Sequence, residues 1–145
     1  MTTQILVATK GQLVEIEKLL IENNLPVDDI QNPAILFFTV SEDEELVGVI
    51  GLEKYESIAL LRSLAVAEKS KGKGIGKRLV DHFLNWCLES GVSEIYLLTT
   101  TADQYFLKNG FLIVSREDVP EVIKGTSQFK GICPSSAVVL AKKLG

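Results

Sequence analysis

The feature that most constrains the fold is a long apolar segment that leads into a glycine-rich basic turn and then into an amphipathic helix. The segment S-I-A-L-L-R-S-L-A-V covers residues 57–66 and is apolar enough for a strand covered on both faces. The turn K-G-K-G-I-G covers residues 71–76, and apolar residues then recur every four positions from Ile75 to Cys87. A buried strand, a glycine turn and a helix in direct succession indicate an α/β domain.

The other apolar segments extend this pattern over the whole chain. Strands are predicted at 4–8, 36–40, 46–52, 57–66, 95–98, 111–115 and 137–140, and helices at 9–23, 75–90, 102–109 and within 120–129. Thr9 and Gln12 have the spacing of a helix-capping box, and Gly91 and Gly110 are natural helix ends. No repeat or linker interrupts the sequence. We therefore predict one α/β domain over residues 1–145, with a mixed, mostly antiparallel sheet flanked by helices.

Composition and charge exclude several classes of protein. Hydrophobic residues make up 46% of the 145 residues and charged residues 23%, which is typical of a globular protein. The net charge of −4 argues against nucleic acid as a partner. Positive charge is nevertheless concentrated in one place, at Lys69, Lys71, Lys73, Lys77 and Arg78. This clustering predicts an anion-binding site at the glycine turn.

The sequence gives little support for a metal site, a membrane-spanning segment or a disulfide bond. Cys87 and Cys133 are far apart and belong to no His/Cys cluster, so no metal site is expected. The helical pattern places Cys87 on an apolar face, where a buried, unreactive thiol is the ordinary interpretation. No cleavable signal pattern and no apolar run of membrane-spanning length are present, so we expect a cytoplasmic protein without a membrane partner.

The glycine turn has the chemistry of a phosphate cradle. The first turn of a helix offers unpaired N–H groups, and glycine lets that backbone approach a ligand closely. The turn is not a nucleotide-triphosphate loop, because Lys77 is followed by Arg78 rather than by a hydroxyl residue that could hold magnesium. Its glycines, at 72, 74 and 76, also do not have the Rossmann spacing. The alternative is a solvated loop that only starts the helix.

The context of the turn resembles a known family. Val66, seven further residues and then Gly74-Ile75-Gly76 at a helix start resemble the acetyl-coenzyme A signature of the GNAT superfamily of N-acetyltransferases. A later strand, Ala102 and a short helix ending in Gly110-Phe111 resemble the same family. The resemblance implies a GNAT fold, acetyl-coenzyme A (acetyl-CoA) as co-substrate and acetyl transfer to a primary amine. Family members often form dimers, so a homodimer is also implied as an option.

A narrower resemblance concerns three segments. L-L-R-S-L-A-V at 60–66, Y-L-L-T-T-T-A at 96–102 and C-P-S-S-A at 133–137 resemble a subgroup of small GNAT proteins associated with arsenic-resistance operons. This resemblance implies a small acceptor that is amino-acid-like or an organoarsenical, without fixing which.

The family resemblance assigns roles to the residues around the turn. The strand around Leu64 and Val66 would offer backbone groups to the pantetheine arm and the acetyl carbonyl. The backbone amides of Gly72, Lys73, Gly74 and Gly76 would bind the pyrophosphate, and the side chains of Lys71 and Lys77 would add positive charge. The family usually opens its sheet after this strand, so the thioester would lie between residues 62–66 and 95–101.

Two positions depart from the family pattern. Many members have a tyrosine four residues before the glycine of Gly-Phe, where it protonates the leaving thiolate. Here that position is Phe106 and the neighbouring Tyr105 is the candidate catalytic acid, with a purely structural role as the alternative, because adjacent helical residues point about 100° apart. Thr99 replaces a frequent asparagine. Phe106 favours a rival function, a non-catalytic acyl-CoA-binding sensor.

Arg62 and Ser63 interrupt the most apolar strand and are candidate substrate-binding residues. A buried arginine requires a partner, so Arg62 either pairs with a carboxylate such as Glu53 or Glu56, or faces the acceptor cleft. Its planar fork suits a substrate carboxylate, which favours an acceptor with an acidic group. Glu53 is also a candidate general base, acting through water, although an exposed loop position is the commoner fate of such a residue.

Overall fold

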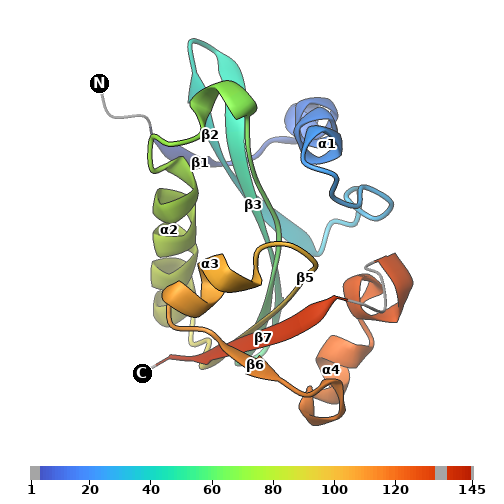
Figure 1. Ribbon diagram of the computed structural model, residues 1–145. Helices are drawn as coiled ribbons and strands as arrows, with labels where there is room; N and C mark the ends of the chain where they lie inside the picture. Colours follow the sequence, from blue (N-terminus) through green and yellow to red (C-terminus); the bar gives the residue numbers. More distant parts are fainter. Residues whose placement is uncertain (1–3, 133–136, 145) are drawn as a thin grey trace.

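The chain folds around one seven-stranded sheet, which the computed structural model describes over residues 4–132 and 137–144. The strands are β1 (Ile5–Val7), β2 (Ile35–Glu42), β3 (Glu45–Tyr55), β4 (Ile58–Val66), β5 (Glu94–Thr99), β6 (Leu112–Val114) and β7 (Val138–Lys143). They are ordered β1-β2-β3-β4-β5-β7-β6, and every neighbouring pair is antiparallel except β4–β5. The predicted mixed, mostly antiparallel sheet is confirmed (Figure 1).

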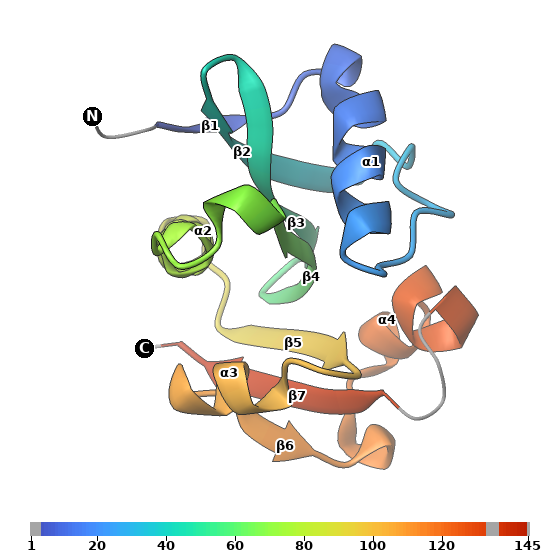
Figure 2. The same cartoon turned by 45° about the horizontal axis from the view of Figure 1, so that its top comes forward.

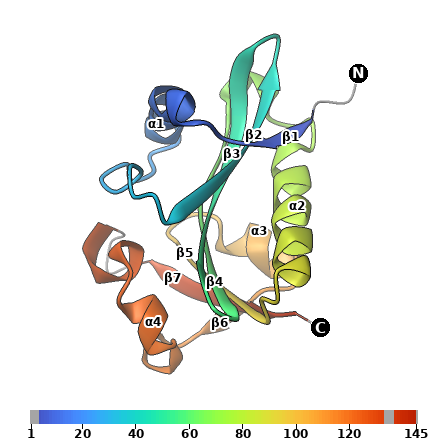
Figure 3. The same ribbon diagram turned by 180° about the vertical axis from the view of Figure 1, so that it is seen from behind.

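Helices cover both faces of the sheet. The helices are α1 (Leu13–Glu22), α2 (Ile75–Glu89), α3 (Asp103–Lys108) and α4 (Glu121–Lys124). Seen from behind, α1 and α4 lie on one face and α2 and α3 on the other (Figure 3). The four residues of α2 that recur every four positions, Ile75, Leu79, Phe83 and Cys87, are all buried. The apolar stripe of α2 therefore anchors the glycine turn to the core.

Two helix predictions need correction at their ends. The capping box is present, with the Thr9 amide donating to Gln12 Oε1 at 2.9 Å, but it caps a short 3₁₀ turn (Lys10–Gln12) that precedes α1. The segment predicted within 120–129 is divided into α4 and a π-helical turn at Gln128–Ile132. Both changes are local, because 3₁₀ turns are frequent at helix ends and π-helical turns are usually single turns.

The sheet opens between β4 and β5, as the resemblance implied. These strands pair only from Ile58–Leu60 to Glu94–Tyr96, so the remainder of each strand has no partner across the junction. Figure 2 shows the consequence, with β1–β4 in one half of the molecule and β5–β7 in the other. Backbone groups of β4 beyond Leu60 that face β5 are therefore left without a ladder partner.

A β-bulge lies in β4 at the same point. Gly51 of β3 opposes Arg62 while Val49 opposes Ala65, so β4 carries one extra residue here. Ser63, inside the bulge, has a φ of 57°, in the left-handed region that side-chain-bearing residues rarely adopt. Bulges re-aim side chains and are frequent beside functional sites. Arg62 and Ser63, which interrupt the apolar strand in the sequence, thus lie at the bulge in β4.

The burial of Cys87 agrees with the prediction made from the sequence. Cys87 is free and fully buried, and burial raises the pKa of its thiol to about 12. The thiolate is the reactive form, so this side chain is inert at neutral pH. None of the helices in the described ranges is both long and apolar enough to cross a membrane.

Candidate active site

A cavity of about 650 Å³ lies where β4 and β5 separate. Its wall is formed by residues 23–26 and 28 after α1, 61–64 of β4, 97–102 at the end of β5, and Phe106, Gln128 and Ala137. Arg62, Ser63 and Leu64, which were predicted to bind substrate and cofactor, all lie on this wall. The segment after α1 was not foreseen as part of the site.

The glycine turn has the geometry of an anion cradle. Gly72 and Gly74 have φ angles of 85° and 81°, and Gly74 is the N-cap of α2. A Cβ added at either glycine would meet no atom within 4 Å, so this backbone faces open space. The backbone amides of residues 72–77 donate to no other residue in the described ranges. Free amides at a helix N-terminus fit a pyrophosphate group such as that of acetyl-CoA.

The lysines around the turn are held in exposed ion pairs. Lys71 pairs with Glu68 at 3.0 Å, Lys73 with Glu42 at 3.4 Å and Lys77 with Asp81 at 3.0 Å. Such pairs are worth little in solvent, so their ammonium groups can turn toward an anion at small cost. The predicted positive patch is therefore present, with its charge partly balanced.

The acidic hairpin tip contacts this turn, which sequence reasoning missed. Glu42 accepts a hydrogen bond of 2.7 Å from the hydroxyl of Ser70, and Glu45 pairs with Lys69. The hydrogen bond from Ser70, supported by Lys73, lowers the pKa of Glu42. The β2–β3 hairpin thereby holds the residues that precede the cradle.

Val66 and Tyr105 lie beneath the first turn of α2. A Cβ at Gly76 would lie 3.8 Å from Val66 Cγ2 and 3.9 Å from the Tyr105 hydroxyl. That hydroxyl is buried and has no hydrogen-bond partner among the described residues. Burial, followed by the charge of Asp81, raises its pKa, whereas Lys77 lowers it. A buried donor without an acceptor is costly, so the Tyr105 hydroxyl contributes little to the stability of the fold.

Phe106, not Tyr105, lies on the cavity wall. The two rings are adjacent in α3 and stand at 86° to each other, so they face different surroundings, as expected for neighbours on a helix. Thr99 accepts hydrogen bonds from the amides of Thr101 and Ala102, at 3.3 and 2.9 Å. The residue in the position of the family's asparagine therefore fixes the turn from β5 into α3.

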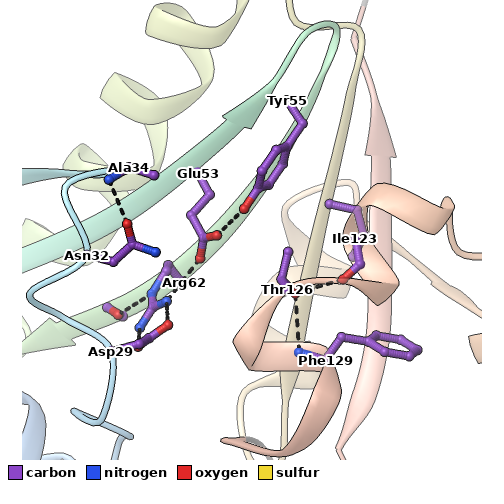
Figure 4. Close-up of polar contacts among 10 residues, drawn as sticks. Asp29, Asn32, Ala34, Glu53, Tyr55, Arg62, Ile123, Thr126 and Phe129 are labelled. Atoms are coloured by element: carbon purple, nitrogen blue, oxygen red, sulfur yellow. Dashed lines mark hydrogen bonds and ion pairs between the residues drawn. The ribbon is translucent and has the colours of Figure 1, made fainter.

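Arg62 is the centre of a buried polar network (Figure 4). Its two terminal nitrogens donate to the two carboxylate oxygens of Asp29, each at 2.6 Å. Nη1 also donates to Glu53 at 3.0 Å, and Nε donates to Ser63 Oγ at 3.1 Å. The ion-pair alternative for Arg62 is thus the one that the geometry supports.

The charge of Arg62 is maintained by its partners. Burial alone would lower the pKa of the guanidinium, but the hydrogen bonds to Asp29 and Glu53 outweigh it and the pKa lies above its ordinary value. Asp29 is itself held by local structure, because the amide of Asn32 donates to the Asp29 carbonyl at 3.0 Å. The network therefore ties the segment after α1 to the bulge in β4.

Glu53 lies behind the cavity wall. Its carboxylate accepts hydrogen bonds from Arg62 and from the hydroxyl of Tyr55, and only 4% of the residue is exposed. Burial and the hydrogen bond to Glu53 raise the pKa of Tyr55. This geometry gives Glu53 the role of orienting Arg62, and its predicted role as a base through water stays a prediction. Glu56 is exposed in the β3–β4 turn.

Metal binding is not indicated over the part of the chain that the structure describes, where no group of three His, Cys, Asp or Glu side chains could hold an ion. Cys133 and the C-P-S-S segment, which contributed to the arsenic-resistance resemblance, lie outside the described residues.

Residues 8–111 match the model of the acetyltransferase (GNAT) family, and the chain belongs to this family. It is 32% identical over 113 residues to an amino-acid acetyltransferase of Ralstonia nicotianae, covering 77% of this chain. It is also 32% identical over 88 residues to an uncharacterised N-acetyltransferase of Chlorobaculum tepidum, covering 60% of this chain. The chain spans only 23% of the first relative and 56% of the second.

Solved structures share the fold. An N-acetylglutamate synthase from Neisseria gonorrhoeae, complexed with coenzyme A and N-acetyl-glutamate, superposes with a TM-score of 0.84 at 22% identity, over 100% of this chain and 36% of that one. A GNAT-family acetyltransferase from Staphylococcus aureus superposes with a TM-score of 0.80 at 21% identity, over 99% of this chain and 100% of that one. The predicted GNAT fold is thereby confirmed.

Proposed function

We propose that this protein is an acetyl-CoA-dependent N-acetyltransferase that acetylates the primary amine of a small acceptor. The observation that carries the proposal is the run of free backbone amides at residues 72–77, facing open space and followed by a sheet that opens into a cavity. Relatives in the family are named as acetyltransferases, and several neighbouring structures contain coenzyme A, which supports the same assignment.

Different residues bind the different parts of acetyl-CoA. The amides of Gly72, Lys73, Gly74 and Gly76 hold the pyrophosphate, and Lys71 and Lys77 add charge from exposed positions. The edge of β4 near Leu64 and Val66, which has no partner strand on the β5 side, offers backbone groups to the pantetheine arm. The acetyl group then lies at the cavity wall near Leu64 and Phe106, and the acceptor enters from the cavity.

The proposed reaction is a direct transfer. The lone pair of a neutral amine attacks the acetyl carbonyl carbon, the carbon–sulfur bond breaks, the sulfur gains a proton, and the proton lost from nitrogen passes to water. Tyr105 is our candidate donor to the sulfur, because its buried hydroxyl has no partner of its own. Ser63 and Arg62 shape the wall against which the acceptor lies.

Two observations bear on the chemical class of the acceptor. The amino-acid acetyltransferases among the relatives favour an amino-acid-like molecule, and the arsenic-resistance resemblance favours an organoarsenical amine. A cytoplasmic location and a homodimer belong to the same proposal and derive from the sequence alone.

Calorimetric titration with coenzyme A, together with release of free thiol from acetyl-CoA in the presence of an amine panel, tests the proposal. We expect binding, and thiol release that depends on the amine. Tight binding without turnover on any amine would instead establish the acyl-CoA sensor. If titration with acetyl-CoA and with coenzyme A gave no heat of binding, both the anion cradle and the proposed reaction would be wrong.

A further inference from the structure

We propose that the acceptor is a cationic amine that carries no carboxylate. This inference rests on the proposed function and deepens it. It reverses the preference for an acidic acceptor that the sequence suggested, because the structure shows how the charges around the cavity are arranged.

The first step is the state of Arg62, the one cation among the described residues that line the cavity. Its side chain is completely buried, both terminal nitrogens are used by Asp29, and Glu53 and Ser63 take two further N–H groups. A guanidinium has five N–H donors, and four of them are occupied here. Little of the planar fork remains for a substrate carboxylate.

The second step is the cost of displacing Asp29. An acceptor carboxylate could pair with the guanidinium of Arg62 only if it displaced Asp29. The Asp29 side chain is only 14% exposed. A buried carboxylate without its partner is strongly unfavourable, so the acceptor would gain one pair by breaking an equivalent one. The same argument applies to Glu53, whose side chain is 5% exposed.

The third step is the net charge of the site. Arg62 contributes one positive charge, and Arg116, which donates to the carbonyl of the wall residue Ala137 at 2.8 Å, contributes a second. Asp29 and Glu53, which contact Arg62, and Asp28, which lies on the cavity wall, contribute three negative charges. A carboxylate entering this cavity is therefore repelled, and an ammonium group is attracted.

Asp28 is the residue that we expect to determine specificity. It is exposed, it lines the cavity, and it forms no ion pair with another described residue. Apart from Arg62, the rest of the described wall is uncharged, and its polar groups include the amide of Asn24 and the hydroxyls of Thr100 and Thr101. These groups can orient an acceptor, but they do not supply the charge that would select a carboxylate.

Matched acceptors test the inference on the wild-type protein. L-leucine and L-leucinamide have nearly the same shape and differ in the carboxylate, and L-glutamate and a short alkyl diamine extend the range of charge. We measure kcat/KM by thiol release from acetyl-CoA and express it per concentration of neutral amine, because the amine of leucinamide is less basic than that of leucine. On this scale we expect kcat/KM to be about tenfold or more higher for leucinamide than for leucine, and lowest for glutamate. Equal or higher kcat/KM for leucine or glutamate would overturn the inference while leaving the acetyltransferase intact. No turnover on any acceptor would overturn the proposed function itself.

Two variants test Asp28 separately. We expect Asp28→Asn to raise KM for leucinamide by roughly three- to tenfold with little change in kcat, because the charge binds the acceptor without taking part in the transfer. Glu17→Gln removes one exposed negative charge from α1, away from the cavity wall, and should leave KM unchanged. If Asp28→Asn and the wild type had the same KM, Asp28 would have no role in acceptor binding.

Discussion

Arg62 and Asp29, which are 33 positions apart in the sequence, face each other through two parallel hydrogen bonds of 2.6 Å. Arg62 flanks the bulge of β4, and Asp29 follows Asp28, which lines the cavity, in the segment after α1. A bidentate pair of this kind fixes both distance and orientation. The shape of the acceptor cavity therefore depends on a charge pair that does not itself have to touch the acceptor.

The first prediction compares two neighbouring aspartates. We expect Asp29→Asn to lower the free energy of unfolding by about 1–3 kcal/mol, because it removes one of the two charges that compensate a fully buried guanidinium. Glu53 remains in place, so the loss should fall short of unfolding the protein. Urea denaturation followed by circular dichroism measures it.

Asp28→Asn is the matched control for stability. The same chemical change at an exposed residue should alter the free energy of unfolding by less than about 0.5 kcal/mol. Equal stability of the two variants would show that the Arg62–Asp29 pair contributes nothing net to folding.

Much of the fold could be predicted because its signals are local. The spacing of Ile75, Leu79, Phe83 and Cys87 specifies the buried face of α2, and the apolar segment at 57–66 specifies a central strand. The predicted ends of elements were less accurate near Lys10–Gln12 and Gln128–Ile132, where a 3₁₀ turn and a π-helical turn replace regular α-helix. Backbone hydrogen bonds at helix ends are satisfied in several ways, and sequence periodicity does not distinguish between them.

The site could be predicted only in part, because its charges pair across the chain. The pairing of Arg62 with Glu53 followed from the rule that a buried arginine requires a partner. Asp29 could not be found in this way, since it lies in an irregular segment whose position depends on the whole fold. Contacts of the hairpin acids Glu42 and Glu45 with the lysine turn were missed for the same reason.

The second prediction concerns the glycine cradle. We expect Gly74→Ala to weaken coenzyme A binding by roughly tenfold or more, because the added Cβ projects into the open space from which the pyrophosphate approaches. The φ of 81° also costs about 1–2 kcal/mol of stability with any side chain. Calorimetric titration gives the affinity, and thermal denaturation without ligand gives the stability.

Gly91 offers a control with the same backbone strain. It follows the C-terminal end of α2 with a φ of 80°, and a Cβ there also meets no atom within 4 Å. Gly91→Ala should therefore lose a similar amount of stability and keep its affinity for coenzyme A. If both variants lost affinity equally, the effect would come from destabilisation of α2 and not from contact with the ligand.

The third prediction concerns the hydroxyl of Tyr105. Tyr105→Phe removes a buried donor that lacks an acceptor, so the ligand-free protein should be as stable as the wild type or more stable by up to about 1 kcal/mol. If the hydroxyl donates to the departing sulfur, kcat should nevertheless fall by roughly tenfold or more.

Burial raises the pKa of Tyr105 above its ordinary value of 10.0, so the donor form persists as the pH rises. The ratio of wild-type to variant kcat should therefore stay constant from about pH 6 to 9. Unchanged kcat together with raised stability would assign Tyr105 to packing beneath the first turn of α2.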